Sequence, residues 1–191
     1  MSSNALAAAR SEIGENIASV RGWLVFIGVA SMVLGTAAII YNTTSTIASV
    51  VVFGSLLMVF GILQVVHAFQ VRYWSGFFLY LLDGIIRATI GTLLVMYPGT
   101  GALSLTLVVS FYFIAGGLFK AFGAGMLQFP SWGWSVVSAL ISVALGVMLV
   151  MRWPESSTWF IGFAVGLELF VYGWALLMFA AAMKGLVPSN A

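Results

Sequence analysis

The sequence predicts an all-α, polytopic membrane protein whose six transmembrane helices form three tandem helical hairpins. Three observations predict this fold class: an apolar composition, apolar runs of span length, and an internal repeat. Of the 191 residues, 62% are hydrophobic and 6% are charged, whereas soluble domains carry about 25% charged residues. Five acidic and seven basic side chains are too few to cover a soluble protein of this size, so we expect the lipid bilayer to be its main partner.

Each apolar run approaches the roughly 20 residues that a helix needs to cross a bilayer core about 30 Å thick. Six such spans are predicted, at residues 23–41, 48–69, 77–97, 102–126, 134–151 and 159–183. Short polar, proline or glycine-containing breaks separate them, at residues 42–46, 70–76, 98–101, 128–133 and 152–157. Breaks this short predict that consecutive helices run antiparallel and leave no room for a soluble domain.

The two ends of the chain are predicted to lie outside the spans. Residues 1–22 place apolar side chains at helical spacing among charged ones, which is typical of a helix along the membrane interface or of a polar tail. Residues 184–191 form a short C-terminal tail. Six spans put both ends on one side, whose bases are Arg10, Arg21, Arg72 and Lys184. The opposite side carries Arg152, close to Glu155. Because bases accumulate on cytoplasmic loops, both termini are expected in the cytoplasm.

An internal repeat of 56 residues is the most specific signal in the chain. It is marked by three evenly spaced glycines, Gly61, Gly117 and Gly173. Small residues recur at the same interval at positions 54, 110 and 166 and at positions 68, 124 and 180. Gly35, Gly91 and Gly146 follow it within one residue. The repeat divides the spans into hairpins at residues 23–69, 77–126 and 134–183, for which a pseudo-threefold arrangement is our hypothesis.

Helices in lipid associate where small side chains let their backbones approach, so the repeated glycines are interpreted as packing positions rather than gating hinges. The candidate packing glycines are Gly35, Gly61, Gly91, Gly117, Gly146, Gly162, Gly166 and Gly173. Gly162 and Gly166 form a GxxxG pattern, and Gly117, Ala121 and Gly125 follow a spacing of four. Exposed small-residue faces such as the one at Gly162 and Gly166 would also allow a homo-oligomer.

Four ionisable residues lie within the predicted spans, where charge is costly and marks a candidate site. They are Asp83, Arg87, Lys120 and Glu168. Asp83 and Arg87 are four residues apart and can pair within one helix. Estimated depth also permits the pairs Arg87–Glu168 and Asp83–Lys120. We interpret the four as a neutral network that fixes helix register, with a proton-responsive element or a permeation path as alternatives.

His67 and Glu168 are the candidates for pH sensing. A histidine titrates near physiological pH, and a desolvated carboxylate can gain or lose a proton in the same range. His67 has no cysteine and no acidic neighbour at helical spacing, so an interfacial or hydrogen-bonded histidine is the simpler interpretation. No metal site is expected.

Several function classes are disfavoured by what the sequence lacks. It has no cysteine, and therefore no disulfide framework and no thiolate nucleophile. A net charge of +2 is too small for a nucleic-acid footprint. No phosphate-binding glycine loop and no H-E-x-x-H or G-x-S-x-G motif occurs. We therefore expect no enzyme, no catalytic residues, no cofactor and no nucleic-acid partner.

The chain resembles the HdeD acid-resistance membrane proteins of bacteria over about residues 20–183. The resemblance rests on the three glycine-punctuated hairpins, the Gly-x5-Tyr-Pro turn at 91–98 and the Val-Gly-Leu-Glu-Leu-Phe run at 165–170. Asn42 stands where this pattern has a proline. The resemblance implies a six-helix, multi-pass protein of the bacterial inner membrane that is associated with acid-stress survival. We therefore expect a non-enzymatic scaffold or stress-response module, with a small transporter or proton-linked channel as the alternative.

Overall fold

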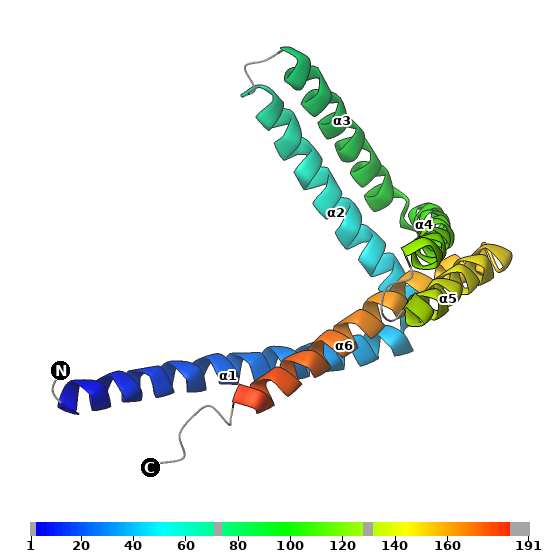
Figure 1. Ribbon diagram of the computed structural model, residues 1–191. Coiled ribbons are helices and arrows are strands. Elements are labelled where there is room, and N and C mark those ends of the chain that lie inside the picture. The colour runs from blue at the N-terminus through cyan, green and yellow to red at the C-terminus, as the bar shows by residue number, and fades with distance from the viewer. Residues whose placement is uncertain (1–2, 71–73, 128–131, 184–191) are drawn as a thin grey trace. The chain divides into compact units, whose positions relative to one another are not determined.

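A computed structural model describes the backbone of residues 3–70, 74–127 and 132–183, and most side chains from residue 19 onward. Its elements are α1 (Ser3–Ile40), α2 (Asn42–Ala68), α3 (Trp74–Met96), α4 (Pro98–Leu127), α5 (Trp132–Met151), the 3-10 helix η1 (Glu155–Thr158) and α6 (Phe160–Met183) (Figure 1). The described residues form no strand, and six helices are long and apolar enough to cross a membrane. The predicted all-α, six-span fold class is confirmed.

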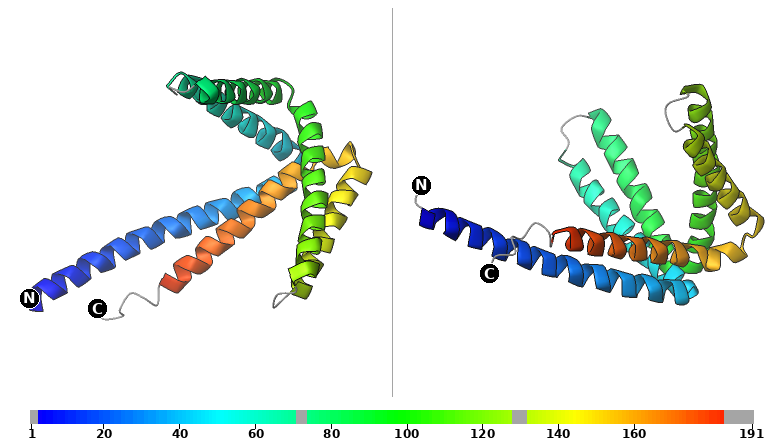
Figure 2. Two further views of the ribbon diagram at one scale, coloured as in Figure 1. Left: turned by 45° about the horizontal axis from the view of Figure 1, so that its top comes forward. Right: turned by 60° about the horizontal axis from the view of Figure 1, so that its bottom comes forward.

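The described chain folds as two compact units. One unit contains α1 and most of α6, and the other spans residues 42–163 with helices α2 to α5. In the first unit α1 and α6 lie side by side in every view (Figure 2). In the second unit α2 packs along α3 and α4 packs along α5, whereas α3 and α4 contact each other much less. The helix pairs that pack along their length in this unit therefore join consecutive repeats rather than the two helices of one repeat.

All three helix pairs use the same contact pattern, in which small residues seven positions apart on one helix face small residues seven positions apart on the other. The facing pairs are Gly35–Gly166 and Gly28–Gly173 in α1·α6, Gly54–Gly91 and Gly61–Gly84 in α2·α3, and Ser110–Gly146 and Gly117–Ala139 in α4·α5. We call each such row of contacts a seam. Each seam joins the second helix of one repeat to the first helix of the next, and α6 returns to α1. Each repeat thus takes part in two seams, and the pseudo-threefold arrangement stays a hypothesis.

The seams leave no room for side chains at their glycines. A Cβ atom added to Gly35 would lie 2.6 Å from the carbonyl oxygen of Gly166 and 2.6 Å from the backbone nitrogen of Phe170. Such distances are far below van der Waals contact, so the two backbones themselves touch. Dispersion contacts between closely apposed backbones are the main source of association for helices surrounded by lipid.

Two details of the predicted glycine packing are wrong. Gly162 and Gly166 are buried within the chain, against the start of α2 and against α1 respectively, and are not exposed for a second copy. The spacing of four through Gly125 is not used either, because a Cβ on Gly125 would meet nothing within 4 Å. Nearly antiparallel helices meet every two turns, which makes seven the working interval.

The predicted breaks at residues 42–46 and 98–101 are also wrong, because both segments form the first turns of helices. Tyr41 and Tyr97 alone separate α1 from α2 and α3 from α4. Proline at the first helical position costs no hydrogen bond, which explains the start of α4. In α2 the Thr46 hydroxyl donates to the carbonyl oxygen of Asn42 over 2.9 Å, so its polar group is satisfied inside the helix.

Helix α1 is continuous from residue 3 through the first span. Its 38 residues extend about 57 Å at 1.5 Å per residue, well beyond a hydrocarbon core about 30 Å thick. Much of the predicted 1–22 segment is therefore a helical extension of the span that begins near Ser19. Arg72, Lys184 and the tail at 184–191 lie outside the described residues.

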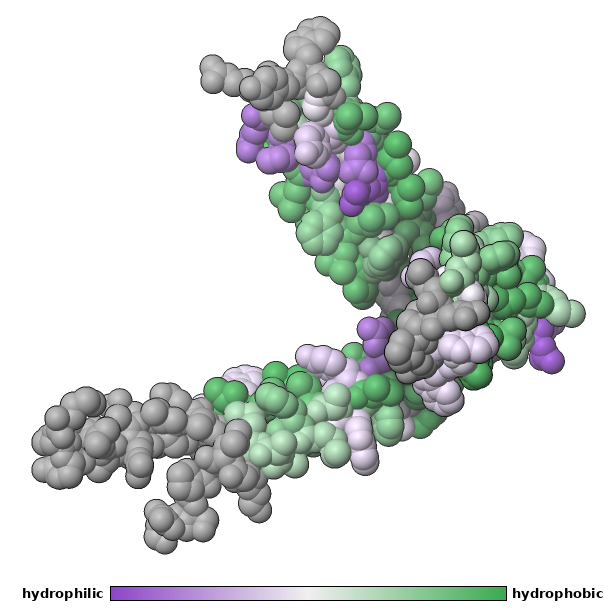
Figure 3. Space-filling model, viewed as in Figure 1, coloured by the Kyte–Doolittle hydropathy of each residue, from purple (hydrophilic) through white to green (hydrophobic). Residues whose placement is uncertain are grey.

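The outer surface of the helices is apolar (Figure 3). Large side chains such as Phe119, Phe122 and Met126 are between 72% and 83% exposed, and small residues fill most of the interior positions. This arrangement inverts that of a soluble bundle, in which large apolar side chains fill the core. The exposed surface is consequently suited to lipid.

Candidate functional site

Asp83 and Arg87 form an ion pair on α3. The Arg87 Nε donates to the Asp83 Oδ2 over 2.8 Å, and the side chains of Arg87 and Asp83 are 48% and 40% exposed respectively. Their spacing of four residues places both on one face of the helix. Hydrophilic atoms gather in the half of the α2·α3 pair that is distant from α4 (Figure 3). Of the pairings that the sequence permits, the structure shows the one between Asp83 and Arg87 within α3.

His67 lies at the end of α2 and contacts Tyr80 of α3. Their rings meet edge to face, with centroids 5.8 Å apart and an interplanar angle of 89°. Tyr80 precedes Asp83 by three residues, so the two share a face of α3. His67 is therefore part of the polar group on the α2·α3 pair. Its assignment as a pH sensor stays a prediction.

Lys120 binds across the α4·α5 seam. Its Nζ donates to the hydroxyl of Ser138 over 2.9 Å. No ion pair joins Lys120 to Asp83 within the described part of the chain. Ser138 was not among the predicted site residues, although it directly precedes Ala139 of the seam. The partner follows from the packing of α4 against α5, which the sequence pattern does not specify.

Glu168 lies on α6 and is exposed within the first unit. Over residues 3–70, 74–127 and 132–183 it forms no hydrogen bond and no ion pair. Arg87 belongs to the second unit, so the predicted pair Arg87–Glu168 and pH sensing by Glu168 stay predictions.

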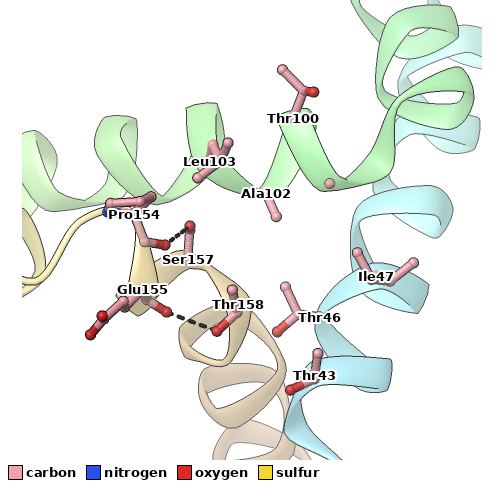
Figure 4. Close-up of a pocket in the computed structure, with 11 residues that line it drawn as sticks. Thr43, Thr46, Ile47, Thr100, Ala102, Leu103, Pro154, Glu155, Ser157 and Thr158 are labelled. Atoms are coloured by element: carbon pink, nitrogen blue, oxygen red, sulfur yellow. Dashed lines mark hydrogen bonds between the residues drawn. The ribbon is translucent and has the colours of Figure 1, made fainter.

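A cavity that the sequence did not predict lies where the turns of the three repeats meet in the second unit (Figure 4). Its volume is about 520 Å³. The lining residues are Thr43, Thr46, Ile47, Gly99, Thr100, Ala102, Leu103, Pro154, Glu155, Ser157 and Thr158. We call it the turn cavity. Its size falls in the range of about 300–1,000 Å³ that is usual for ligand sites.

The turn cavity is built from equivalent positions of the repeat. Positions 43, 99 and 155 line it at intervals of 56 residues, and so do positions 46, 102 and 158. All three repeats therefore contribute residues to the lining of this one cavity. The repeat of the turns at this interval is the sequence signal that relates these lining positions to one another.

Three of the five hydroxyl groups in the cavity lining donate to backbone carbonyls. Thr158 donates to the carbonyl oxygen of Glu155 over 2.8 Å, and Ser157 donates to that of Pro154. Thr46 donates within α2 and also accepts a hydrogen bond from the backbone N–H of Gly162 over 2.9 Å. With these donors occupied, the walls present mostly carbon atoms. Glu155 is the ionisable residue of the lining.

A small apolar cluster lies beside the turn cavity and holds the helices at this end. It contains Val50, Leu94 and Ala102, with Leu57, Leu105 and Ile161 packed against it. Ala102 belongs both to this cluster and to the cavity lining. The walls of the cavity are consequently fixed by α2, α3 and α4 together.

The six apolar helices and the seams of small residues define the class of the protein, which is an integral, multi-pass membrane protein. The chain belongs to the family described as "Short repeat of unknown function (DUF308)", whose model matches residues 26–91 and 82–151, about two thirds of its length. The two matches begin 56 residues apart, which confirms the predicted internal repeat. No curated protein and no solved structure matches the chain.

Proposed function

We propose that this chain is a non-enzymatic protein of the bacterial inner membrane, of the HdeD type, that supports survival of acid stress as a membrane scaffold. The DUF308 repeat is typical of HdeD-like membrane proteins, and the resemblance of the hairpins supports the same assignment. The bases of the N-terminal segment support cytoplasmic termini. Lipid is the proposed principal partner, and association with further copies would use surfaces other than Gly162 and Gly166.

The Asp83–Arg87 ion pair is the observation that favours a scaffold. A carboxylate and a guanidinium 2.8 Å apart on one helix neutralise each other, so the pair needs no water-filled path. Lys120 similarly contacts a seam-side serine. Three of the four intramembrane ionisable residues thus have partners that stabilise helix structure or helix pairing.

Glu168 favours the second candidate, a proton-linked transporter or channel. Within the described residues this carboxylate has no hydrogen-bond or ion-pair partner. Ionisable groups at membrane depth usually serve ion or proton pathways when they are not paired structurally. In this alternative Glu168 carries the proton.

Proton flux separates the two candidates. The full chain would be reconstituted in liposomes that contain a trapped pH-sensitive dye, and an external acid step would be applied. The scaffold predicts dye signals equal to those of protein-free liposomes. Flux that disappears in Glu168→Gln but persists in the matched control Glu155→Gln, outside the helical spans, would exclude the scaffold and support transport.

A survival assay tests the physiological part of the proposal. A bacterial strain lacking its own copy of this gene would be challenged with acid, with and without the wild-type chain. We expect the wild-type chain to restore survival and Glu168→Gln to restore it equally. Survival that does not depend on the chain would refute the acid-stress role.

A further inference from the structure

We propose that the turn cavity holds one acyl chain of a membrane phospholipid, taken from the leaflet on the side of the turns. In this binding site, residues of all three repeats would contact the same acyl chain. It is distinct from the intramembrane charges, and the proposal is independent of the function proposed above.

The walls of the turn cavity select an apolar occupant. Ile47, Ala102, Leu103 and Pro154 supply carbon atoms, and Ala102 points its methyl group into the space (Figure 4). The hydroxyls of Ser157 and Thr158 donate to neighbouring backbone carbonyls (Figure 4). A water molecule needs two to four polar partners, so a cavity of about 520 Å³ whose Thr46, Ser157 and Thr158 hydroxyls already donate to backbone carbonyls offers few sites for ordered water.

The charge of the lining indicates that the acyl chain, and not the headgroup, enters. The lining contains no lysine and no arginine, and its one ionisable residue is the acidic Glu155. A phosphate group would therefore meet no cation in the cavity and would be repelled by the carboxylate. A phospholipid can instead leave its phosphate at the membrane surface and insert a tail.

The position of the cavity makes a phospholipid tail the appropriate apolar molecule. Thr43, Thr100 and Thr158 of the lining are exposed, so the cavity can be entered. Tyr97 and Trp153 lie beside it in the chain, and aromatic residues of this kind mark the boundary between hydrocarbon and headgroups. Acyl chains begin at this depth.

Lipid retention measured by native mass spectrometry tests the proposal. The purified full chain would be incubated in micelles with phosphatidylethanolamine or phosphatidylglycerol of identical acyl chains and then released from detergent in the spectrometer. We expect one retained phospholipid per chain with either headgroup. Thr43→Phe places a ring in the cavity and should lower occupancy by about tenfold or more, as expected when burial of several methylenes is lost.

Thr44→Phe is the matched control, because Thr44 is the exposed neighbour of Thr43 on α2 and does not line the cavity. It should retain the phospholipid as the wild type does. Ala102→Leu fills the cavity from α4 and should lower phospholipid retention as Thr43→Phe does. Because Ala102 is buried, this variant can fail to fold, and the retention by Thr43→Phe, at an exposed position, is then the test. Equal retention by Thr43→Phe and the wild type, equal loss in Thr44→Phe, or retention of one headgroup only would overturn the proposal.

Discussion

Asp83 and Arg87 carry opposite charges into an apolar helix, and their stability depends on each other. Their contact of 2.8 Å is made within a single turn of α3, so it forms together with the helix. Removing one partner leaves a charge in a poorly solvating environment, whereas removing both leaves an apolar face suited to lipid. The consequence is a strong non-additivity of substitutions.

Arg87→Leu should therefore destabilise the protein more than the double variant Asp83→Leu/Arg87→Leu. We expect a difference of about 2 kcal/mol, less than the 3–5 kcal/mol of fully buried pairs because both side chains are partly exposed. Thermal unfolding in detergent micelles measures it. Equal unfolding temperatures for the two variants would show that the pair contributes nothing.

At this scale the sequence identified the charged residues but not all of their partners. The pair Asp83–Arg87 could be predicted because helical spacing alone brings the residues together. The contact from Lys120 to Ser138 could not, because it depends on which helices pack together. The turn cavity escaped prediction for a related reason. Its residues lie up to 115 positions apart (Thr43 to Thr158), and their proximity results from the meeting of three turns.

At the scale of the helices, the seams determine which faces pack. A glycine in a seam has no room for a side chain, whereas a glycine outside the seam has room for one, even when the two are neighbours in the sequence. A Cβ on Gly117 would lie 2.7 Å from the Val143 Cγ2 and 2.8 Å from the carbonyl oxygen of Ala139. A Cβ on Gly116 would meet nothing within 4 Å.

Gly117→Ala should consequently destabilise the protein by about 1–3 kcal/mol, as overpacking does. Gly116→Ala should be neutral or stabilise it by up to about 1 kcal/mol, because alanine favours the helix. Denaturation in mixed micelles compares the two variants. An equal response to both substitutions would indicate that α4 and α5 do not approach as described.

Helix number and span length could be predicted because they follow from local hydropathy. Helix starts were less predictable. Asn42 and Pro98 were assigned to breaks, yet both begin helices, since polar and proline residues are as suitable for a first helical turn as for a loop. The sequence pattern could not predict which helices pack together. The repeat interval is the same whether a helix packs against the other helix of its own repeat or against a helix of the next repeat.

At the scale of the whole molecule, the even number of spans fixes both termini to one side of the membrane. The start of α4 and the end of α2 should then face opposite compartments. The chain has no cysteine, so a single introduced cysteine reports its own accessibility without background. This property makes the proposed cytoplasmic position of the termini directly measurable.

Thr100→Cys should react with a membrane-impermeant maleimide in intact spheroplasts, whereas Gln70→Cys should react only after lysis. Both positions are exposed, so the difference between them reports membrane sidedness. Mass-shift labelling on gels provides the measurement. The reversed pattern would place the termini outside the cytoplasm.

The return of α6 to α1 gives the repeats a cyclic order in which none is structurally first. Each seam joins the end of one repeat to the beginning of the next, including the step from Gly166 and Gly173 back to Gly35 and Gly28. A circular permutant that is opened between α2 and α3 and closed by a linker between the original termini would break only the covalent link between α2 and α3. All three seams would keep their residues. The same logic allows a gene encoding fewer repeats to build the equivalent set of seams from several copies.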